Sequence, residues 1–109
     1  MIKPSIGRVV WYHPSPSDPG SHNPGDIHAA IIARVWSDTC INVAVFDSNG
    51  VAYSRTSVLL LQPVDEQETP TGGGYAEWMP YQIGQAGKAE QLQSKVDSLA
   101  RGYTNADAA

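Results

Sequence analysis

Short apolar runs, separated by polar residues, prolines and glycines, fill the first 61 residues of the chain. Segment 7–13 is rich in β-branched and aromatic residues and stops at Pro14, which is typical of a strand. Segment 28–36 is apolar at consecutive positions and therefore predicts a central strand that is covered on both faces. Segment 40–46 alternates, which predicts a third strand with one buried face.

The dipeptide 49–50, Asn-Gly, predicts a two-residue type I′ hairpin turn, because both residues tolerate positive φ angles. Such a turn fixes the strand register and places Phe46 opposite Tyr53 and Ala44 opposite Arg55. That face is mixed in character and suits ligand contact or solvent exposure. The other face is the expected core side and holds Ile41, Val43, Val45, Ser54, Thr56 and Val58.

Residues 58–61 form a further apolar run, which is either another buried strand or the end of the fourth strand after a bend. Four or five short strands within residues 1–63 predict a mainly β fold. We expect a small SH3-like β-barrel, with a partly open roll as the alternative. Residues 14–26 hold four prolines and two glycines and must form a long loop, which in a small domain is usually functional or mobile.

The composition changes after the predicted barrel. Residues 64–83 are expected to be a linker followed by an aromatic segment that packs back on the barrel. Residues 84–102 predict an amphipathic helix, and 103–109 a frayed tail. A helix with so narrow an apolar stripe needs a partner, either its own barrel or the same helix of another subunit. We expect a homo-oligomer formed through this stripe, which consists of Ala89, Leu92, Val96 and Leu99.

Charge and composition restrict the function further. The chain has 109 residues, 41% of them hydrophobic, and a net charge of −4, which fits a globular domain. The negative net charge argues against a nucleic-acid polymer as partner. The excess negative charge lies entirely after residue 60, which weakens this argument for the neutral barrel and leaves the barrel compatible with a small anionic ligand. One cysteine, Cys40, excludes an intramolecular disulfide, and no apolar run spans a membrane. We expect a cytoplasmic protein.

Three segments in combination resemble a group of small accessory proteins encoded by tailed bacteriophages and prophages. These segments are 3–14, 35–47 and 73–82, and the resemblance extends over roughly residues 3–90. It implies a phage origin and a place in the host cytoplasm or the virion. It implies no reaction and assigns no catalytic residue.

No constellation of acid, base and nucleophile stands out, so we expect a protein that is not an enzyme and has no cofactor. Cys40 begins an apolar strand, where a small core residue is the usual role. Gly72–Gly74 lacks the lysine of a phosphate loop and suggests a hinge. Imidazole and carboxylate groups that could bind a metal lie in or beside the long loop, but their spacing matches no compact metal-ligand motif. No metal site is therefore predicted from these residues, which are His13, His22, His28, Asp18 and Asp26.

The remaining candidate is a binding surface made of aromatic rings, arginines and small polar groups. Aromatic rings stack on nucleobases, and guanidinium groups bind phosphates through paired hydrogen bonds. Trp11 and Trp36 have the alternative role of barrel core. The predicted ligand-binding residues are Arg8, Trp11, Tyr12, Trp36, Ser37, Asn42, Tyr53, Arg55 and Trp78.

The sequence therefore favours a non-enzymatic phage binding module. Its most concrete form is a counter-defence protein that sequesters a nucleotide-derived immune signal of the host. One alternative is a virion or morphogenesis accessory protein. The other is an inhibitor that binds a host defence protein directly.

Overall fold

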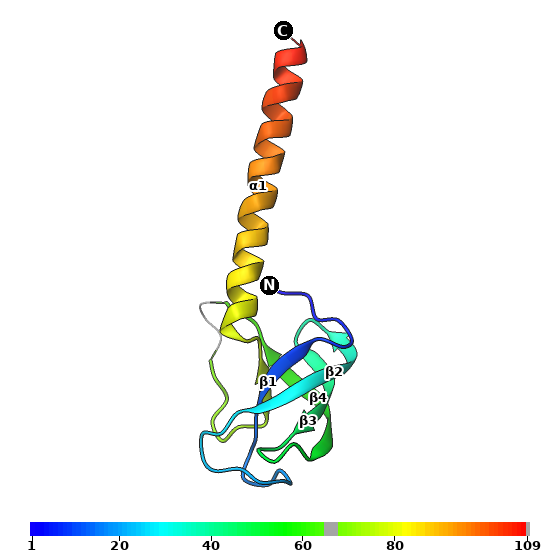
Figure 1. Cartoon of the computed structure of the whole chain (residues 1–109), viewed down its shortest axis with the longest axis vertical. Coiled ribbons are helices and arrows are strands. Elements are labelled where there is room, and N and C mark those ends of the chain that lie inside the picture. The colour runs from blue at the N-terminus through cyan, green and yellow to red at the C-terminus, as the bar shows by residue number, and fades with distance from the viewer. Residues whose placement is uncertain (65–67, 109) are drawn as a thin grey trace. The chain divides into compact units, whose positions relative to one another are not determined.

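A closed five-stranded barrel and one helix make up the chain, according to a computed structural model that describes residues 1–64 and 68–108 (Figure 1). The mainly β prediction of a small barrel with a C-terminal helix is thereby confirmed. Residues Met1–Met79 form one compact unit, and the helix forms a second. The elements are β1 (Val9–His13), β2 (His28–Ser37), β3 (Cys40–Phe46), β4 (Ala52–Leu61), β5 (Tyr75–Glu77) and α1 (Pro80–Ala108).

The barrel closes because β5 inserts between the first and fourth strands. It pairs antiparallel with β1 and parallel with β4. The aromatic segment that contains β5 also contributes Trp78, which is 1% exposed. Alternating side chains from the strands fill the interior, among them Val10, Ala30, Ile32 and Val45.

The second strand departs from its predicted burial. β2 pairs with both β1 and β3, so it is central as expected. Only alternate residues such as Ala30 and Ile32 face the interior, however, while Ala29 and Ile31 are exposed. A closed barrel has a single interior, and its outer face is not covered by a further layer within the described Met1–Met79 unit.

The register of the β3–β4 hairpin also differs from the prediction. Gly50 has a φ angle of 81°, whereas Asn49 is not among the described residues with positive φ, so the turn is not type I′. The Asp47 N–H donates to the carbonyl of Val51, and the Gly50 N–H donates to the carbonyl of Asp47. These bonds define a three-residue loop, a type I turn followed by glycine.

One extra loop residue shifts the cross-strand pairs between the turn and Val43. Val45 now lies opposite Tyr53, and Val43 lies opposite Arg55. Tyr53 and Arg55 therefore share the interior side of the sheet with the two valines, and do not share a face with Ala44 and Phe46. The turn forms in this way because Asp47 Oδ1 accepts the N–H groups of Asn49 and Val51, each at 2.9 Å.

A bulge restores the apolar register further along β4. Ser57 has a φ angle of 52°, and its N–H donates to Asn42 Oδ1 at 2.8 Å. Beyond it Val58 lies opposite Ile41, and Val58 and Leu60 are buried. The run 58–61 is therefore the end of the fourth strand after a bend, and not a separate strand.

The helix is longer than the predicted 84–102. It begins at Pro80, because proline suits the first turn of a helix, where its missing N–H is not needed. It continues past Gly102 to Ala108, within the predicted tail. Its apolar stripe is exposed, with Leu92 64%, Val96 50% and Leu99 74% accessible. No helix within the described residues has the length and apolar character that a membrane crossing requires.

Candidate functional site

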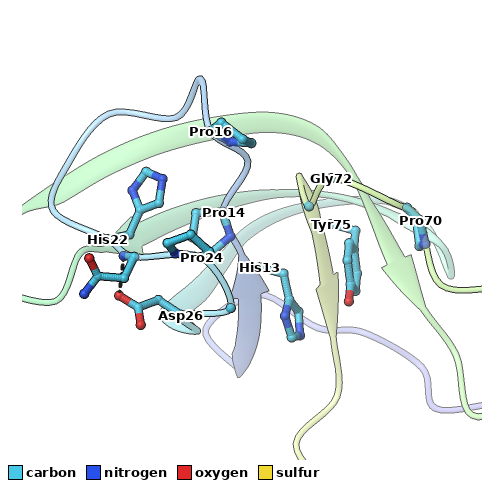
Figure 2. Close-up of a pocket in the computed structure, with 12 residues that line it drawn as sticks. His13, Pro14, Pro16, His22, Pro24, Asp26, Pro70, Gly72 and Tyr75 are labelled. Atoms are coloured by element: carbon cyan, nitrogen blue, oxygen red, sulfur yellow. Dashed lines mark hydrogen bonds between the residues drawn. The ribbon is translucent and has the colours of Figure 1, made fainter.

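A pocket of about 530 Å³ lies between the long loop after β1 and the segment that leads into β5. Figure 2 shows loop residues on one side, with Tyr75, Gly72 and Pro70 on the other. Its walls combine flat proline rings, two imidazoles and one phenol. The lining residues are His13, Pro14, Pro16, His22, Asn23, Pro24, Gly25, Asp26, Pro70, Gly72, Gly73 and Tyr75.

A stacked aromatic pair forms the part of the pocket nearest the barrel. His13 ends β1 and pairs with Tyr75 of β5, so their side chains lie next to each other. The two rings are parallel to within 12°, with centroids 4.5 Å apart. His13 Nε2 lies 2.8 Å from Glu77 Oε1, which fixes the orientation of the imidazole. Burial, followed by the nearby Glu77 carboxylate, raises the pKa of Tyr75.

Three glycines bring the second segment against the loop. Gly72, Gly73 and Gly74 all have φ angles of 80–86°, a region that other residues adopt only with strain. A Cβ atom at Gly73 would overlap the carbonyl oxygen of Pro14. The Gly74 N–H donates to the carbonyl of His13 at 2.6 Å. Gly72 and Gly73 therefore line one wall of the pocket, and Gly73 packs closely against the backbone of Pro14.

His22 supplies a polar group in the loop wall. Its ring meets the ring of His28 edge to face, with centroids 5.7 Å apart. Its Nδ1 atom is buried and has no hydrogen-bond partner among the residues that the structure describes. Nearby, Asp26 Oδ2 accepts the N–H of Asn23 at 2.7 Å and thereby shapes the loop. A buried nitrogen without a partner costs free energy, and a ligand atom or a water molecule would remove that cost.

Asp18 anchors the loop to the barrel. Its carboxylate accepts hydrogen bonds from the Tyr12 hydroxyl at 2.6 Å and the Ser15 N–H at 2.9 Å, and it pairs with Arg55 Nε at 2.5 Å. Burial alone would raise the pKa of Asp18, but the bonds from Tyr12, Ser15 and Arg55 outweigh it and lower the pKa. Burial, followed by the bond to Asp18, raises the pKa of Tyr12.

A second anchor holds the loop further along. Asp47 Oδ2 accepts the Ser21 N–H at 3.0 Å, and this bond, followed by the bond from the Val51 N–H, lowers the pKa of Asp47. Beneath the loop, His28 is 1% exposed, and its Nδ1 atom lies 3.0 Å from the Tyr53 hydroxyl. Asp18 and Asp47 therefore tie the loop to the barrel at two points, and these contacts hold the loop wall of the pocket in place.

Tyr53 provides a test of this buried network. Burial, followed by the negative charge of Asp18, raises the pKa of Tyr53 to about 12. The folded protein therefore favours the protonated Tyr53 phenol. As the pH rises, this phenol loses its proton first in the unfolded chain, at about pH 10. We expect the free energy of unfolding to fall between about pH 10 and pH 12, and Tyr53→Phe to reduce that slope. Urea unfolding at several pH values checks this, and an unchanged slope in Tyr53→Phe contradicts it.

The structure distributes the nine residues predicted from sequence over separate places. Tyr12, Tyr53 and Arg55 belong to the network beneath the loop, with Arg55 5.1 Å from the Tyr53 ring. Arg8 lies over the Trp78 ring at 4.5 Å. Trp11 is half-buried on the outer face of β1.

The remaining three lie around the β2–β3 hairpin. Trp36 Nε1 donates to Asn42 Oδ1 at 2.9 Å, and Arg34 stacks on the Trp36 ring at 3.8 Å. The Ser37 hydroxyl accepts the N–H of Thr39 at 3.3 Å, within the turn. Trp36 is 53% exposed and is therefore not barrel core.

None of these nine residues is among the described residues that line the pocket between the long loop and β5. The lining comes from the proline-rich loop and the glycine segment, which the sequence marks as a long loop and a possible hinge. The sequence suggests only a metal-ligand role for His13 and His22, at a spacing that matches no compact ligand motif. Among the described side chains, no group of three or more histidines, cysteines and acids is placed to hold a metal ion.

No protein-family model, curated protein or solved structure matched this chain when they were compared with it.

Proposed function

We propose that this chain is a non-enzymatic module that binds a nucleotide-sized molecule in the pocket between the long loop and β5. The pocket of about 530 Å³ with its stacked His13–Tyr75 pair carries this proposal. Small-molecule sites commonly occupy about 300–1,000 Å³ and combine apolar walls with a few polar groups. Four proline rings and Tyr75 supply such walls here, and His22 and Asn23 supply polar groups.

The lining favours recognition of a flat heteroaromatic ring. Proline rings and His13, which stacks on the buried Tyr75 ring, line the pocket, and a base can stack on such flat rings without directional demands. The side chains of His22 and Asn23 line the pocket and supply polar groups that suit a hydrogen bond to the edge of such a ring. No arginine or lysine lines the described pocket, so a phosphate group of the ligand would extend from it toward solvent.

A sequestering role accounts for this site better than catalysis. The lining residues include no serine, cysteine or lysine nucleophile. The resemblance to phage accessory proteins directs the proposal to host immunity, where a phage gains from removing a nucleotide-derived signal. We therefore propose a counter-defence protein that holds such a signal in the host cytoplasm.

Calorimetry of the folded protein with cyclic oligonucleotides and cyclic ADP-ribose species tests this proposal. We expect one ligand per pocket, and expect His22→Ala and Tyr75→Leu to weaken binding, since one base stack contributes about 1–3 kcal/mol. Trp36→Ala is the control, because Trp36 is an exposed aromatic residue outside the pocket. Absence of heat with every compound contradicts the proposal, as does an equal loss in Trp36→Ala.

A further inference from the structure

An apolar patch covers the outer face of the barrel over its first three strands. Strand alternation turns these side chains away from the interior, since their neighbours Val10, Ala30 and Val45 are fully buried. The pairings Val9–Ile31, Ile31–Ala44, Trp11–Ala29 and Ala29–Phe46 make the patch continuous across the strands. This β1–β2 patch consists of Val9, Trp11, Ala29, Ile31, Ala44 and Phe46.

The patch is accessible to a partner. Val9 and Ile31, which lie opposite each other at its centre, are each 38% exposed. Ala29 is exposed, and Trp11, Ala44 and Phe46 are half-buried. Contiguous apolar patches of this kind on a small domain mark interaction sites. The sequence of β2 agrees, because consecutive apolar residues are typical of a strand that is covered on both faces.

Opposite charges border the patch at two ends. Glu77 lies next to Trp11 on the β5 side, in the row that continues through Ala29. Arg34 lies beyond the Val9–Ile31 row on β2, where it pairs with Asn42. The acidic and the basic residue therefore flank the central row from opposite sides.

We propose that a second copy of this chain packs face to face on the β1–β2 patch. A two-fold axis in the plane of the contact, crossing the Val9–Ile31 row, places Glu77 of one copy opposite Arg34 of the other. The same symmetry brings the two apolar centres together and repeats the charge pair. The face is thus complementary to itself, which favours a second copy over an unrelated partner. This dimer goes beyond the proposed ligand site, with which it shares only Glu77, the residue whose Oε1 atom lies 2.8 Å from His13 Nε2.

The helix is the rival interface, because α1 also carries exposed apolar residues. Its stripe is narrow and extends over about two heptads, which is marginal for a coiled coil in water. Lys88 and Lys95 lie at the heptad positions that flank this stripe. Within the described stripe, no acidic residue occupies a flanking position, where it could form a salt bridge with these lysines in a second helix. The β1–β2 patch has the broader apolar surface and the complementary charges.

Sedimentation velocity over a range of concentrations tests the dimer with three variants of the full chain. Ile31→Lys is expected to raise the dimer Kd by at least about tenfold. Leu59→Lys is the matched control, because Leu59 is 37% exposed on β4, outside the patch. Leu92→Lys tests the helix stripe, and both of these variants should retain the Kd of the original protein. Circular dichroism melting verifies that each variant is folded.

A charge exchange tests the two-fold arrangement. Arg34→Glu should weaken the dimer, and adding Glu77→Arg in the same chain should restore it, because the pair then re-forms with reversed signs. A protein that remains monomeric at every concentration overturns the proposal. So does a dimer that Leu92→Lys or Leu59→Lys weakens as much as Ile31→Lys, or a charge exchange without any restoration.

Discussion

Replacing Asp18 with alanine is expected to destabilise the barrel by about 2–3 kcal/mol and to abolish ligand binding in the pocket. The substitution removes the acceptor for the Tyr12 hydroxyl, the Ser15 N–H and Arg55. Tyr12 is 2% exposed, so its hydroxyl would remain buried without this partner. The Arg55 side chain is 31% exposed and regains some hydration, which keeps the loss below that of a fully buried ion pair.

Urea unfolding measures this loss, with Asp38→Ala as the control. Asp38 is also an aspartate in a loop of the barrel unit, but it lies in the β2–β3 turn, away from the Asp18 network. We expect Asp38→Ala to cost less than about 1 kcal/mol. Equal losses in the two variants would show that Asp18 does not anchor the loop.

The Asp18 anchor also predicts a pH dependence. Its pKa is lowered in the folded state, so the unfolded chain takes up a proton first as the pH falls. The stabilisation is therefore complete at neutral pH and is lost as the pH falls below about 5, through the usual aspartate pKa of about 4. Asp18→Asn should show a shallower acid slope than the original protein in the same unfolding assay. An identical slope would contradict the lowered pKa.

The strands were predictable because their signals are local. Segment 40–46 was predicted with the bounds that β3 has, since its alternation repeats at every second residue. The register of the β3–β4 hairpin was not predictable in this way, because Asp47 accepts hydrogen bonds from two backbone N–H groups and the loop gains one residue. That competition depends on one side chain, and the Asn-Gly pattern does not reveal it.

The candidate site was harder to predict than the fold. Its walls come from two segments, 13–26 and 70–75, which lie far apart in the sequence and meet only when β5 pairs with β1. Local patterns carry no information on such a meeting. The sequence predicted a long proline-rich loop that is functional or mobile, but it placed ligand binding at residues such as Trp36 and Arg55. In the structure the Trp36 ring stacks with Arg34, and Arg55 pairs with Asp18, so neither lines the pocket.

Substitution of Gly73 with alanine is expected to cost more than about 3 kcal/mol in stability and to disrupt the pocket. Gly73 has a φ angle of 82°, which costs alanine about 1–2 kcal/mol. In addition, the new Cβ atom would overlap the carbonyl oxygen of Pro14, a backbone atom that cannot rotate away as a side chain does. The segment that leads into β5 must then move away from His13, and the hydrogen bond from the Gly74 N–H to the His13 carbonyl is lost.

The neighbouring Gly72 is a matched control for this substitution. Its φ angle is 86°, so alanine there meets the same conformational cost, but a Cβ atom would have no neighbour within 4 Å. Gly72→Ala should therefore lose only the conformational part, about 1–2 kcal/mol, in urea unfolding. The difference between the two variants measures the close approach of the glycine segment to Pro14. Equal costs would mean that this segment yields easily, and the pocket would then lack the fixed wall on which the proposed stacking of a ligand against Tyr75 depends.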